Sequence, residues 1–286
     1  KNIKKKTIIV IEASSYQLEY SKLFKSNYAV ILNISVDHLE RHKTIEKYIS
    51  AKFKLIKNQN KNSIAFINKY DKYSQIRVKK HTYKSKIIKV DTKLKKRFMN
   101  TFQNDYFSSI SNKENLSFVI EIANRFNVKK SNLKNVVNNF KGLNYRQQII
   151  FKNKSILIIN DSKSTSYSSS IEMLKTTNNT YWIIGGIPKK GDKFVLPKNY
   201  YQNIKGYIFG SYQRKFLLDL KDKIRLKKFS NLKITLRELF KELKKDNSNK
   251  KIVLFSPAAA SFDAFKNFEE RGLYFNKLIK KYINVR

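Results

Sequence analysis

Short apolar runs alternate with polar and charged stretches along the whole chain, and the spacing of the apolar residues differs from one stretch to the next. Continuous apolar runs bounded by polar residues predict buried strands. Apolar residues three and four positions apart predict helices, here over about 44–57 and 112–126. In the first half of the chain the predicted strands cover residues 7–11, 28–33, 63–67 and 87–90.

The second half repeats one strand-and-helix unit several times. Its predicted strands lie near residues 148–151, 155–159, 180–184, 206–209 and 251–255, with helical segments between them. This alternation is typical of a Rossmann-like, doubly wound sheet in which most strands are parallel. Gly142 is the first glycine of the chain and interrupts the pattern. The sequence therefore predicts two α/β domains, residues 1–142 and 143–286.

Composition supports a folded protein and leaves the meaning of its charge open. Hydrophobic residues make up 41% of the chain, which is enough to build buried cores, although the formal net charge is +40. A basic surface is the signature of nucleic-acid binding, and residues 69–97 combine twelve basic residues with interleaved tyrosines. The basic residues are nevertheless spread over the whole length, and Lys, Asn and Ile share adenine- and thymine-rich codons. We therefore treat nucleic-acid binding as the alternative hypothesis.

Two further classes are excluded or disfavoured by what the sequence lacks. It contains no cysteine, so it has neither disulfides nor thiolate metal ligands. No apolar run approaches the length of about 18 residues that a membrane span requires. We expect a cytoplasmic protein.

Polar residues follow the predicted strand at 155–159 without a break. Residues 160–165 read Asn-Asp-Ser-Lys-Ser-Thr and supply a carboxylate, an ammonium group and hydroxyls. In open α/β sheets ligands bind beyond the carboxyl ends of the strands, which favours a binding site. The same residue types also cap helices, and the local pattern alone favours a helix N-terminus.

Candidate metal ligands follow two strands of the first half. Glu12 comes after the strand at 7–11 and His38 comes after the strand at 28–33. A carboxylate and an imidazole can bind a divalent cation, but a strand-end glutamate and a surface histidine would give the same pattern. Lys52 lies in the helix that follows.

Two further loops could contact substrate. Residues 185–192 contain three glycines, but Asp192 stands where a nucleotide-binding loop needs lysine, so only a turn that presents Lys189 or Lys190 to an anion remains. Residues 256–263 are small and polar and follow the last strand. The three histidines all lie in the first half, which makes a serine-histidine catalytic triad improbable.

Taken in order, these segments resemble the Mur ligase family. The matching segments are residues 12–19, Asn33 with Asp37 and His38, Lys52, Asn112 with Asn115, 142–146, 160–165, 190–191 and 256–272. The resemblance implies a central P-loop-type ATPase domain followed by a carboxyl-terminal domain that binds an amino acid. Because the first residue is Lys1 and the first half has no glycine, we expect the central domain to be partial, with its phosphate loop and a UDP-binding domain upstream.

The resemblance also implies an activity. Within the family the carboxyl-terminal segment favours the members that add D-glutamate to UDP-N-acetylmuramoyl-L-alanine through an acyl phosphate, with ATP and Mg²⁺. A chain without the phosphate loop is expected to be inactive by itself. Another Mur ligase or a folylpolyglutamate synthase is the alternative within the class. We expect a monomer.

Residue roles follow from the matched positions. The implied magnesium ligands are Glu12, His38 and a carbamylated Lys52, and His38, Lys52 and Lys163 are the implied catalytic residues. The implied ATP contacts are Asn115, Arg146 and Asp161. The implied contacts with D-glutamate and the reacting phosphate are Lys163, Thr165, Lys190, Ser261 and Phe268. The sequence departs from the family at Ser111, Tyr145 and Ser166, which puts fine contacts with ATP in doubt.

Overall fold

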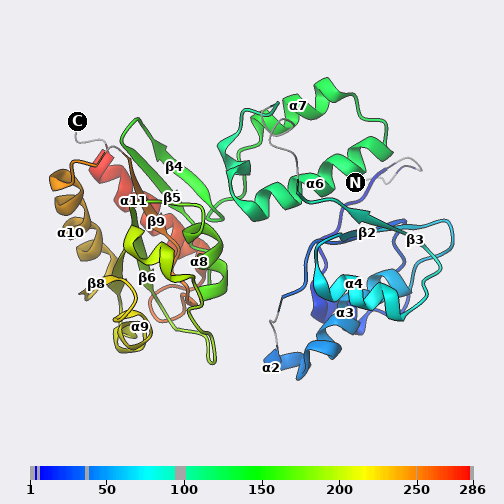
Figure 1. Ribbon diagram of the computed structural model, residues 1–286, viewed down its shortest axis with the longest axis horizontal. Helices are drawn as coiled ribbons and strands as arrows, with labels where there is room; N and C mark the ends of the chain where they lie inside the picture. Colours follow the sequence, from blue (N-terminus) through cyan, green and yellow to red (C-terminus); the bar gives the residue numbers. More distant parts are fainter. Residues whose placement is uncertain (1–3, 5–6, 36–38, 94–100, 249, 284–286) are drawn as a thin grey trace. The chain divides into compact units, whose positions relative to one another are not determined.

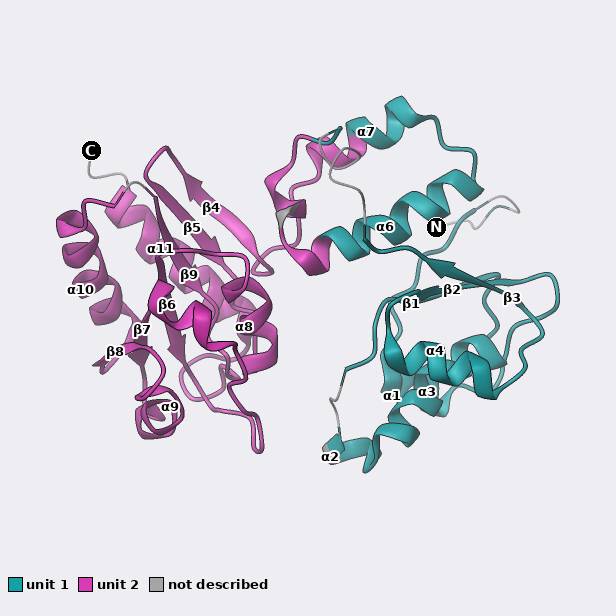
Figure 2. Ribbon diagram, in the orientation of Figure 1, with its two compact units in different colours: residues 1–102, 113–135 teal, residues 103–112, 136–286 magenta. Residues whose placement is uncertain are grey.

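The computed structural model describes residues 4, 7–35, 39–93, 101–248 and 250–283. The chain divides into two compact units (Figure 2). Unit 1 comprises residues 1–102 and 113–135, and unit 2 comprises residues 103–112 and 136–286. Helices α6 (Ile110–Arg125) and α7 (Lys130–Asn139) each contribute residues to both units. The division of the chain into two domains after residue 142 stays a prediction.

Unit 1 is built on a three-stranded parallel sheet. Its strands are β1 (Tyr28–Ile31), β2 (Ile64–Asn68) and β3 (Lys86–Val90), in that order. Helices α3 (Ile45–Lys57) and α4 (Lys72–Lys80) connect them and pack on one face of the sheet. On the other face Phe118 of α6 packs against Phe66 and Val90. Both faces of the sheet are thus covered, as the apolar strands require.

The helices of unit 1 begin where local chemistry favours it. Helix α3 starts after Thr44, whose hydroxyl accepts a hydrogen bond from the Lys47 N–H at 3.2 Å, and it buries Phe53 and Ile56. The predictions of helices at 44–57 and 112–126 are confirmed by α3 and α6. Two short helices, α1 (Ser15–Tyr20) and α2 (Leu39–His42), precede α3.

The predicted strand at residues 7–11 is wrong. These residues belong to no strand, and the side chains of Ile8, Ile9, Val10 and Ile11 are 59–91% exposed. A parallel strand is stable only when a neighbouring strand supplies hydrogen-bonding partners. Within the described part of the chain, no strand pairs with this segment.

Unit 2 is built on a six-stranded sheet. The strands are β4 (Gln148–Lys152), β5 (Ile156–Asn160), β6 (Thr180–Gly185), β7 (Ile204–Phe209), β8 (Arg225–Phe229) and β9 (Lys251–Phe255). They lie in the order β4-β5-β9-β6-β7-β8, and every pair is parallel except β4 with β5. The predicted doubly wound, mainly parallel sheet is therefore confirmed.

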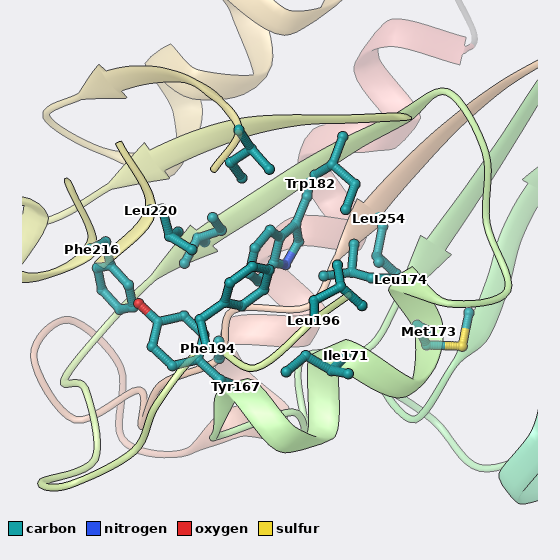
Figure 3. Close-up of a cluster of buried hydrophobic side chains, with 14 of the residues drawn as sticks. Tyr167, Ile171, Met173, Leu174, Trp182, Phe194, Leu196, Phe216, Leu220 and Leu254 are labelled. Atoms are coloured by element: carbon teal, nitrogen blue, oxygen red, sulfur yellow. The ribbon is translucent and has the colours of Figure 1, made fainter. Parts of the chain in front are cut away.

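Helices cover both faces of this sheet (Figure 1). Helices α8 (Tyr167–Leu174) and α9 (Gln213–Leu220) pack on one face, where Trp182 is fully buried among apolar side chains (Figure 3). Helices α10 (Leu232–Lys245) and α11 (Phe268–Ile283) pack on the other face against Tyr181 and Phe255. Neighbouring residues of β6 serve opposite faces because side chains alternate along a strand. The short 3-10 helices η1 (Asp105–Ser108) and η2 (Lys198–Asn203) complete the unit.

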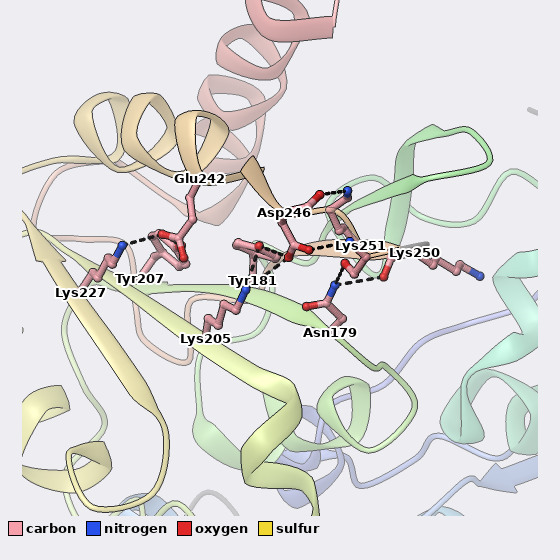
Figure 4. A network of polar contacts seen from close by, with 10 residues as sticks. Asn179, Tyr181, Lys205, Tyr207, Lys227, Glu242, Asp246, Lys250 and Lys251 are labelled. Carbon is pink, nitrogen blue, oxygen red and sulfur yellow. Dashed lines mark hydrogen bonds and ion pairs between the residues drawn. The ribbon is translucent and has the colours of Figure 1, made fainter. Parts of the chain in front are cut away.

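A polar network fixes α10 and the residues after it to the sheet (Figure 4). The Tyr207 hydroxyl donates to Glu242 Oε2 at 2.5 Å, and Tyr181 donates to Asp246. Lys205 Nζ lies 3.3 Å from Asp246 Oδ2. None of the helices in the described residues is long and apolar enough to cross a membrane.

Candidate active site

The carboxyl ends of three adjacent strands of unit 2 carry most of the candidate residues. Strand β9 lies between β5 and β6, with Phe255 level with Asn160 on one side and with Ile183 on the other. The chain after β5 leads to α8 on one face, whereas the chain after β9 leads to α11 on the other face. Such a point, where successive connections leave to opposite faces, is the usual place for a ligand in this type of sheet.

The polar run at 160–165 is anchored at its start and is not the cap of a helix. The Asn160 side chain donates to Gly272 O at 2.9 Å and to Asn276 Oδ1 at 2.7 Å, and its oxygen accepts from Ser162 N at 3.0 Å. Helix α8 begins later, and its cap is Ser166, whose hydroxyl accepts from Ser169 N. The capping interpretation of the run is therefore wrong.

Asp161 is buried and lies among hydrogen-bond donors. Its Oδ1 accepts from Gln147 N at 3.1 Å and its Oδ2 accepts from Ser256 Oγ at 3.0 Å. Burial raises the pKa of Asp161 to about 7, since desolvation outweighs the two hydrogen bonds and the nearby Arg146 charge, which lower it. The buried carboxyl group of Asp161 therefore gains or loses its charge near neutral pH.

Arg146 sits in a turn that is held on both sides. The backbone φ angles are 74° at Gly142, 61° at Tyr145 and 49° at Gln147, and the two non-glycine values are uncommon. Tyr145 O accepts from Lys163 N at 3.0 Å.

Gln147 holds the other side of this turn with its side chain. Its Oε1 accepts from Ser109 Oγ at 2.7 Å and from Asn112 Nδ2 at 2.9 Å, and its backbone N–H donates to Asp161. Gln147 could not be identified from the sequence, because its hydrogen-bond partners are 14 to 38 residues away.

The candidate amino-acid contacts lie on the same edge. Lys163 is exposed, and its Nζ lies 5.0 Å from the centre of the Phe268 ring, a favourable cation–π distance. Thr165 and Lys190 are exposed, whereas Ser261 is buried. The edge thus presents two ammonium groups to solvent beside hydroxyl groups and an aromatic ring.

The loop that carries Lys190 is attached at both ends. Ile187 pairs with Ala260 through two backbone hydrogen bonds of 2.9 Å. At the far end Asp192 Oδ2 accepts from Tyr167 N at 2.5 Å, at the start of α8. The resulting loop holds Lys190 at the carboxyl end of β6.

The candidate residues of unit 1 are less completely described. Glu12 is exposed just before α1, and Asn115 is half-buried on α6. Lys52 Nζ donates to Asn33 O at 3.3 Å and lies 5.1 Å from the centre of the Tyr48 ring. His38 lies outside the described residues. In the part of the chain that the structure describes, no group of three or more His, Asp or Glu side chains is placed to hold a metal ion.

Two buried polar residues near these sites were given no role from the sequence. His42 is 2% exposed, and its Nε2 lies 3.0 Å from Ser15 Oγ, three residues after Glu12. Arg271 is 1% exposed on α11. A signal for Arg271 exists, because it stands between Phe268 and Phe275 on the apolar face of that helix.

The chain is similar in sequence to proteins of one family. Residues 1–137 match the Mur ligase middle domain. The UDP-N-acetylmuramoylalanine–D-glutamate ligase of Rickettsia bellii is 32% identical over 290 residues, covering 94% of this chain and 64% of that protein. The protein of the same name from Leptospira interrogans is 32% identical over 317 residues, covering 97% of this chain and 67% of its own length. The chain thus spans about two thirds of the length of the relatives it matches.

Solved structures share the fold at low sequence identity. MurF from Acinetobacter baumannii superposes with a TM-score of 0.62 at 14% identity, covering 92% of this chain and 62% of that one. MurF ligase from Thermotoga maritima, solved in complex with ADP, superposes with a TM-score of 0.59 at 14% identity, covering 90% and 63%. Fold, sequence similarity and the order of the matched segments agree, and the chain belongs to the Mur ligase family.

Proposed function

We propose that the chain is the part of a D-glutamate-adding Mur ligase that binds the amino acid and contributes to ATP binding. The activity is the ATP-dependent joining of D-glutamate to UDP-N-acetylmuramoyl-L-alanine in peptidoglycan synthesis. The observation that carries the proposal is the edge of unit 2 at which Lys163, Lys190 and Ser261 follow three adjacent parallel strands. The relatives named above, which are D-glutamate ligases, support the choice of amino acid.

The reaction would proceed in two steps, phosphorylation of the substrate carboxylate and attack by the amine. The substrate carboxylate attacks the γ-phosphorus of ATP, an acyl phosphate forms and ADP leaves. The D-glutamate amine then attacks the acyl carbon, a C–N bond forms, and the C–O bond to phosphate breaks with loss of inorganic phosphate and a proton from nitrogen. Both steps concentrate negative charge, so preorganised cations contribute most. In this proposal Lys163 and Lys190 supply that charge in unit 2.

Dicarboxylate recognition follows from the same groups. Each carboxylate of D-glutamate needs a cation or hydroxyl donors to replace its hydration. Lys163 and Lys190 are exposed cations, and Thr165 and Ser261 add hydroxyls at the same edge. Phe268 gives the aliphatic part of the amino acid an apolar surface and orients Lys163.

For ATP we propose contacts from Asn115, Arg146 and Asp161. The turn at Arg146 supports this assignment, because it presents a guanidinium group from a backbone fixed on both sides. Asp161 has both oxygens occupied by Gln147 and Ser256, so we assign it a second task, that of holding this turn.

For Mg²⁺ we propose Glu12, His38 and Lys52. An ammonium group repels a cation, and unmodified Lys52 donates a hydrogen bond to a carbonyl, so it fits only after carbamylation has made it a carboxylate. Bound Mg²⁺ would neutralise phosphate charge during phosphoryl transfer. The exposed carboxylate of Glu12 is a suitable oxygen ligand.

Calorimetric titration of this chain tests the amino-acid specificity. We expect D-glutamate to bind and L-glutamate to bind at least about tenfold more weakly. Lys190→Met should abolish most of the D-glutamate affinity, whereas Lys198→Met, at an exposed lysine of the same unit, should not. Equal affinity for the two enantiomers would contradict the proposal.

Activity is measured separately, as phosphate release by the polypeptide that the complete gene encodes. D-glutamate should be the preferred amino acid, and preference for L-lysine, diaminopimelate or L-glutamate would reassign the chain within its class. The family assignment does not favour the alternative of a nucleic-acid-binding protein. Monomeric state and cytoplasmic location stay predictions.

A further inference from the structure

Arg271 is among the largest side chains that are fully buried in the molecule. It occupies a core-facing position of α11, where an apolar residue would be expected from the helix pattern. Burial lowers the pKa of Arg271 to about 10, opposed by the charge of Asp263, so the guanidinium group keeps its charge at neutral pH. Among the described residues it forms no ion pair. Asp263 is thus the charged partner that acts on Arg271, but without direct contact. A buried charge that is balanced only at a distance is expensive, and its presence calls for a role beyond packing.

The guanidinium group hydrogen-bonds to two loops. Its Nε donates to Ser162 Oγ at 3.1 Å and its Nη2 donates to Ser162 O at 2.7 Å. Its Nη1 donates to Gly185 O at 3.3 Å. The Ser162 hydroxyl in turn donates to Phe268 O at 2.9 Å, at the start of α11. Arg271 thereby joins the loop after β5, the end of β6 and its own helix.

A third loop closes around the same group. A Cβ atom at Gly186 would lie 2.9 Å from Arg271 Nη1, 2.2 Å from Ala260 O and 3.2 Å from Ala259 Cβ. Gly186 also has a φ angle of 122°, which residues other than glycine rarely adopt. The loops after β6 and β9 therefore meet at Gly186, beside Arg271, and the Ile187–Ala260 backbone bridge keeps them together.

We propose that Arg271 is the positioning residue of the amino-acid site. It holds three loops in one arrangement, and this inference rests on the proposed function, in which those loops carry Lys163, Lys190 and Ser261. Its charge also adds to the positive potential at the edge that would receive a dicarboxylate. Lysine cannot replace it, because one ammonium group does not reach acceptors that the planar guanidinium group meets along three separate directions.

Hydrogen–deuterium exchange of Arg271→Lys tests the clamp without any ligand. We expect amides of residues 161–166, 185–192 and 259–263 to exchange faster together, while those of β7 and α10 stay at parent rates. Arg214→Lys, at an exposed arginine of the same unit, is the matched control and should change none of them. Unchanged exchange, or equal acceleration throughout unit 2, would overturn the proposal.

Ser162→Ala is a milder second variant, in case Arg271→Lys does not fold. It removes the hydroxyl between Arg271 and Phe268 and leaves the charge in place. The same three segments should lose protection, by a smaller factor. If exchange increases only at residues 161–166, Arg271 does not join the loops and the proposal fails.

D-glutamate titration tests the consequence. Arg271→Lys should bind D-glutamate about tenfold more weakly than the parent, and Arg214→Lys should bind it equally well. Parent-like affinity in Arg271→Lys would remove the positioning role even if exchange had changed. If the parent itself binds no D-glutamate, the proposed function fails, while the exchange experiment still decides whether the clamp exists.

Discussion

Asp161→Asn should make unit 2 more stable at alkaline pH, although it changes a residue of the candidate site. The pKa of Asp161 lies at about 7, against an ordinary value of 3.8. The folded protein therefore binds this proton more tightly than the unfolded chain does. The contribution of Asp161 to stability is greatest below about pH 4 and falls as the pH rises toward about 7, where the buried carboxyl group ionises.

The magnitude follows from the two pKa values. Each pH unit between them corresponds to about 1.4 kcal/mol, so ionising Asp161 removes on the order of 4 kcal/mol from the free energy of unfolding. Asparagine has the same shape, still accepts from Gln147 N–H, and does not ionise. The free energy of unfolding of the variant, relative to the parent, should therefore rise by about 2–3 kcal/mol between pH 5 and pH 8.

Urea unfolding followed by tryptophan fluorescence measures the difference in the free energy of unfolding between variant and parent, and it reports on unit 2. Trp182 is the only tryptophan of the sequence, is fully buried, and donates to Ser256 O beside Asp161. Measurements at pH 5, 6, 7 and 8 give the slope, and subtracting the parent removes the contribution of other groups.

Asp246→Asn provides a control of opposite sign. Hydrogen bonds from Ser248 and Tyr181 hold the pKa of Asp246 well below its usual range. Its stabilising effect is present above the ordinary pKa and is lost as the pH falls through the lowered value. That variant should be less stable than the parent at pH 7 and approach it in acid. A pH-independent difference for Asp161→Asn, or a loss of stability at pH 8, would refute the reasoning about burial.

Three further predictions concern single positions. Gly186→Ala should destabilise unit 2 by about 3 kcal/mol in the same urea assay, because its Cβ would collide with Ala260 O, whereas Gly191→Ala, with open space around it, should lose only about 1 kcal/mol. Lys163→Met should weaken D-glutamate binding by about tenfold in calorimetry, and full affinity would remove Lys163 from the site. Lys52→Ala should abolish phosphate release by the polypeptide of the complete gene, with partial recovery on adding a short carboxylate; unchanged turnover would exclude Lys52.

Most strands of unit 2 could be predicted because a buried strand is built from apolar residues, which the sequence shows directly. All six residues of β6 are buried, and such a strand reads as one continuous apolar run. β8 was missed for the converse reason: it is an edge strand with the sequence Arg-Leu-Lys-Lys-Phe, and three of its five residues are exposed. Residues 7–11 have the apolar pattern of a buried strand and yet are exposed. Local pattern reports a tendency to be buried, but the neighbour that would bury a segment lies elsewhere in the chain.

The candidate site was predictable to the extent that it follows the strands. Asp161 and Lys163 could be found because polar residues after an apolar strand mark the carboxyl edge of a sheet. The functional lysines are harder to recognise, because the chain has 61 basic residues and the local sequence does not distinguish Lys52 or Lys190 from the others. Arg271 could not be assigned a task from the sequence, because its partner Ser162 is 109 residues away.

Two adjacent residues connect the parts of the site within unit 2. Asp161 holds Gln147, and through it the turn that presents Arg146, while Ser162 accepts from Arg271 and donates to Phe268. Both residues follow β5 directly, so the strand fixes their separation to that of one peptide unit. The proposed nucleotide contacts and the proposed amino-acid contacts of this unit therefore share one short, buried segment of backbone. A segment that is attached on both sides tolerates little displacement. We therefore expect residues 161 and 162 to fix the positions of the groups that bind substrate, whereas the exposed side chains of Lys163 and Lys190 supply the positive charge and the contacts themselves.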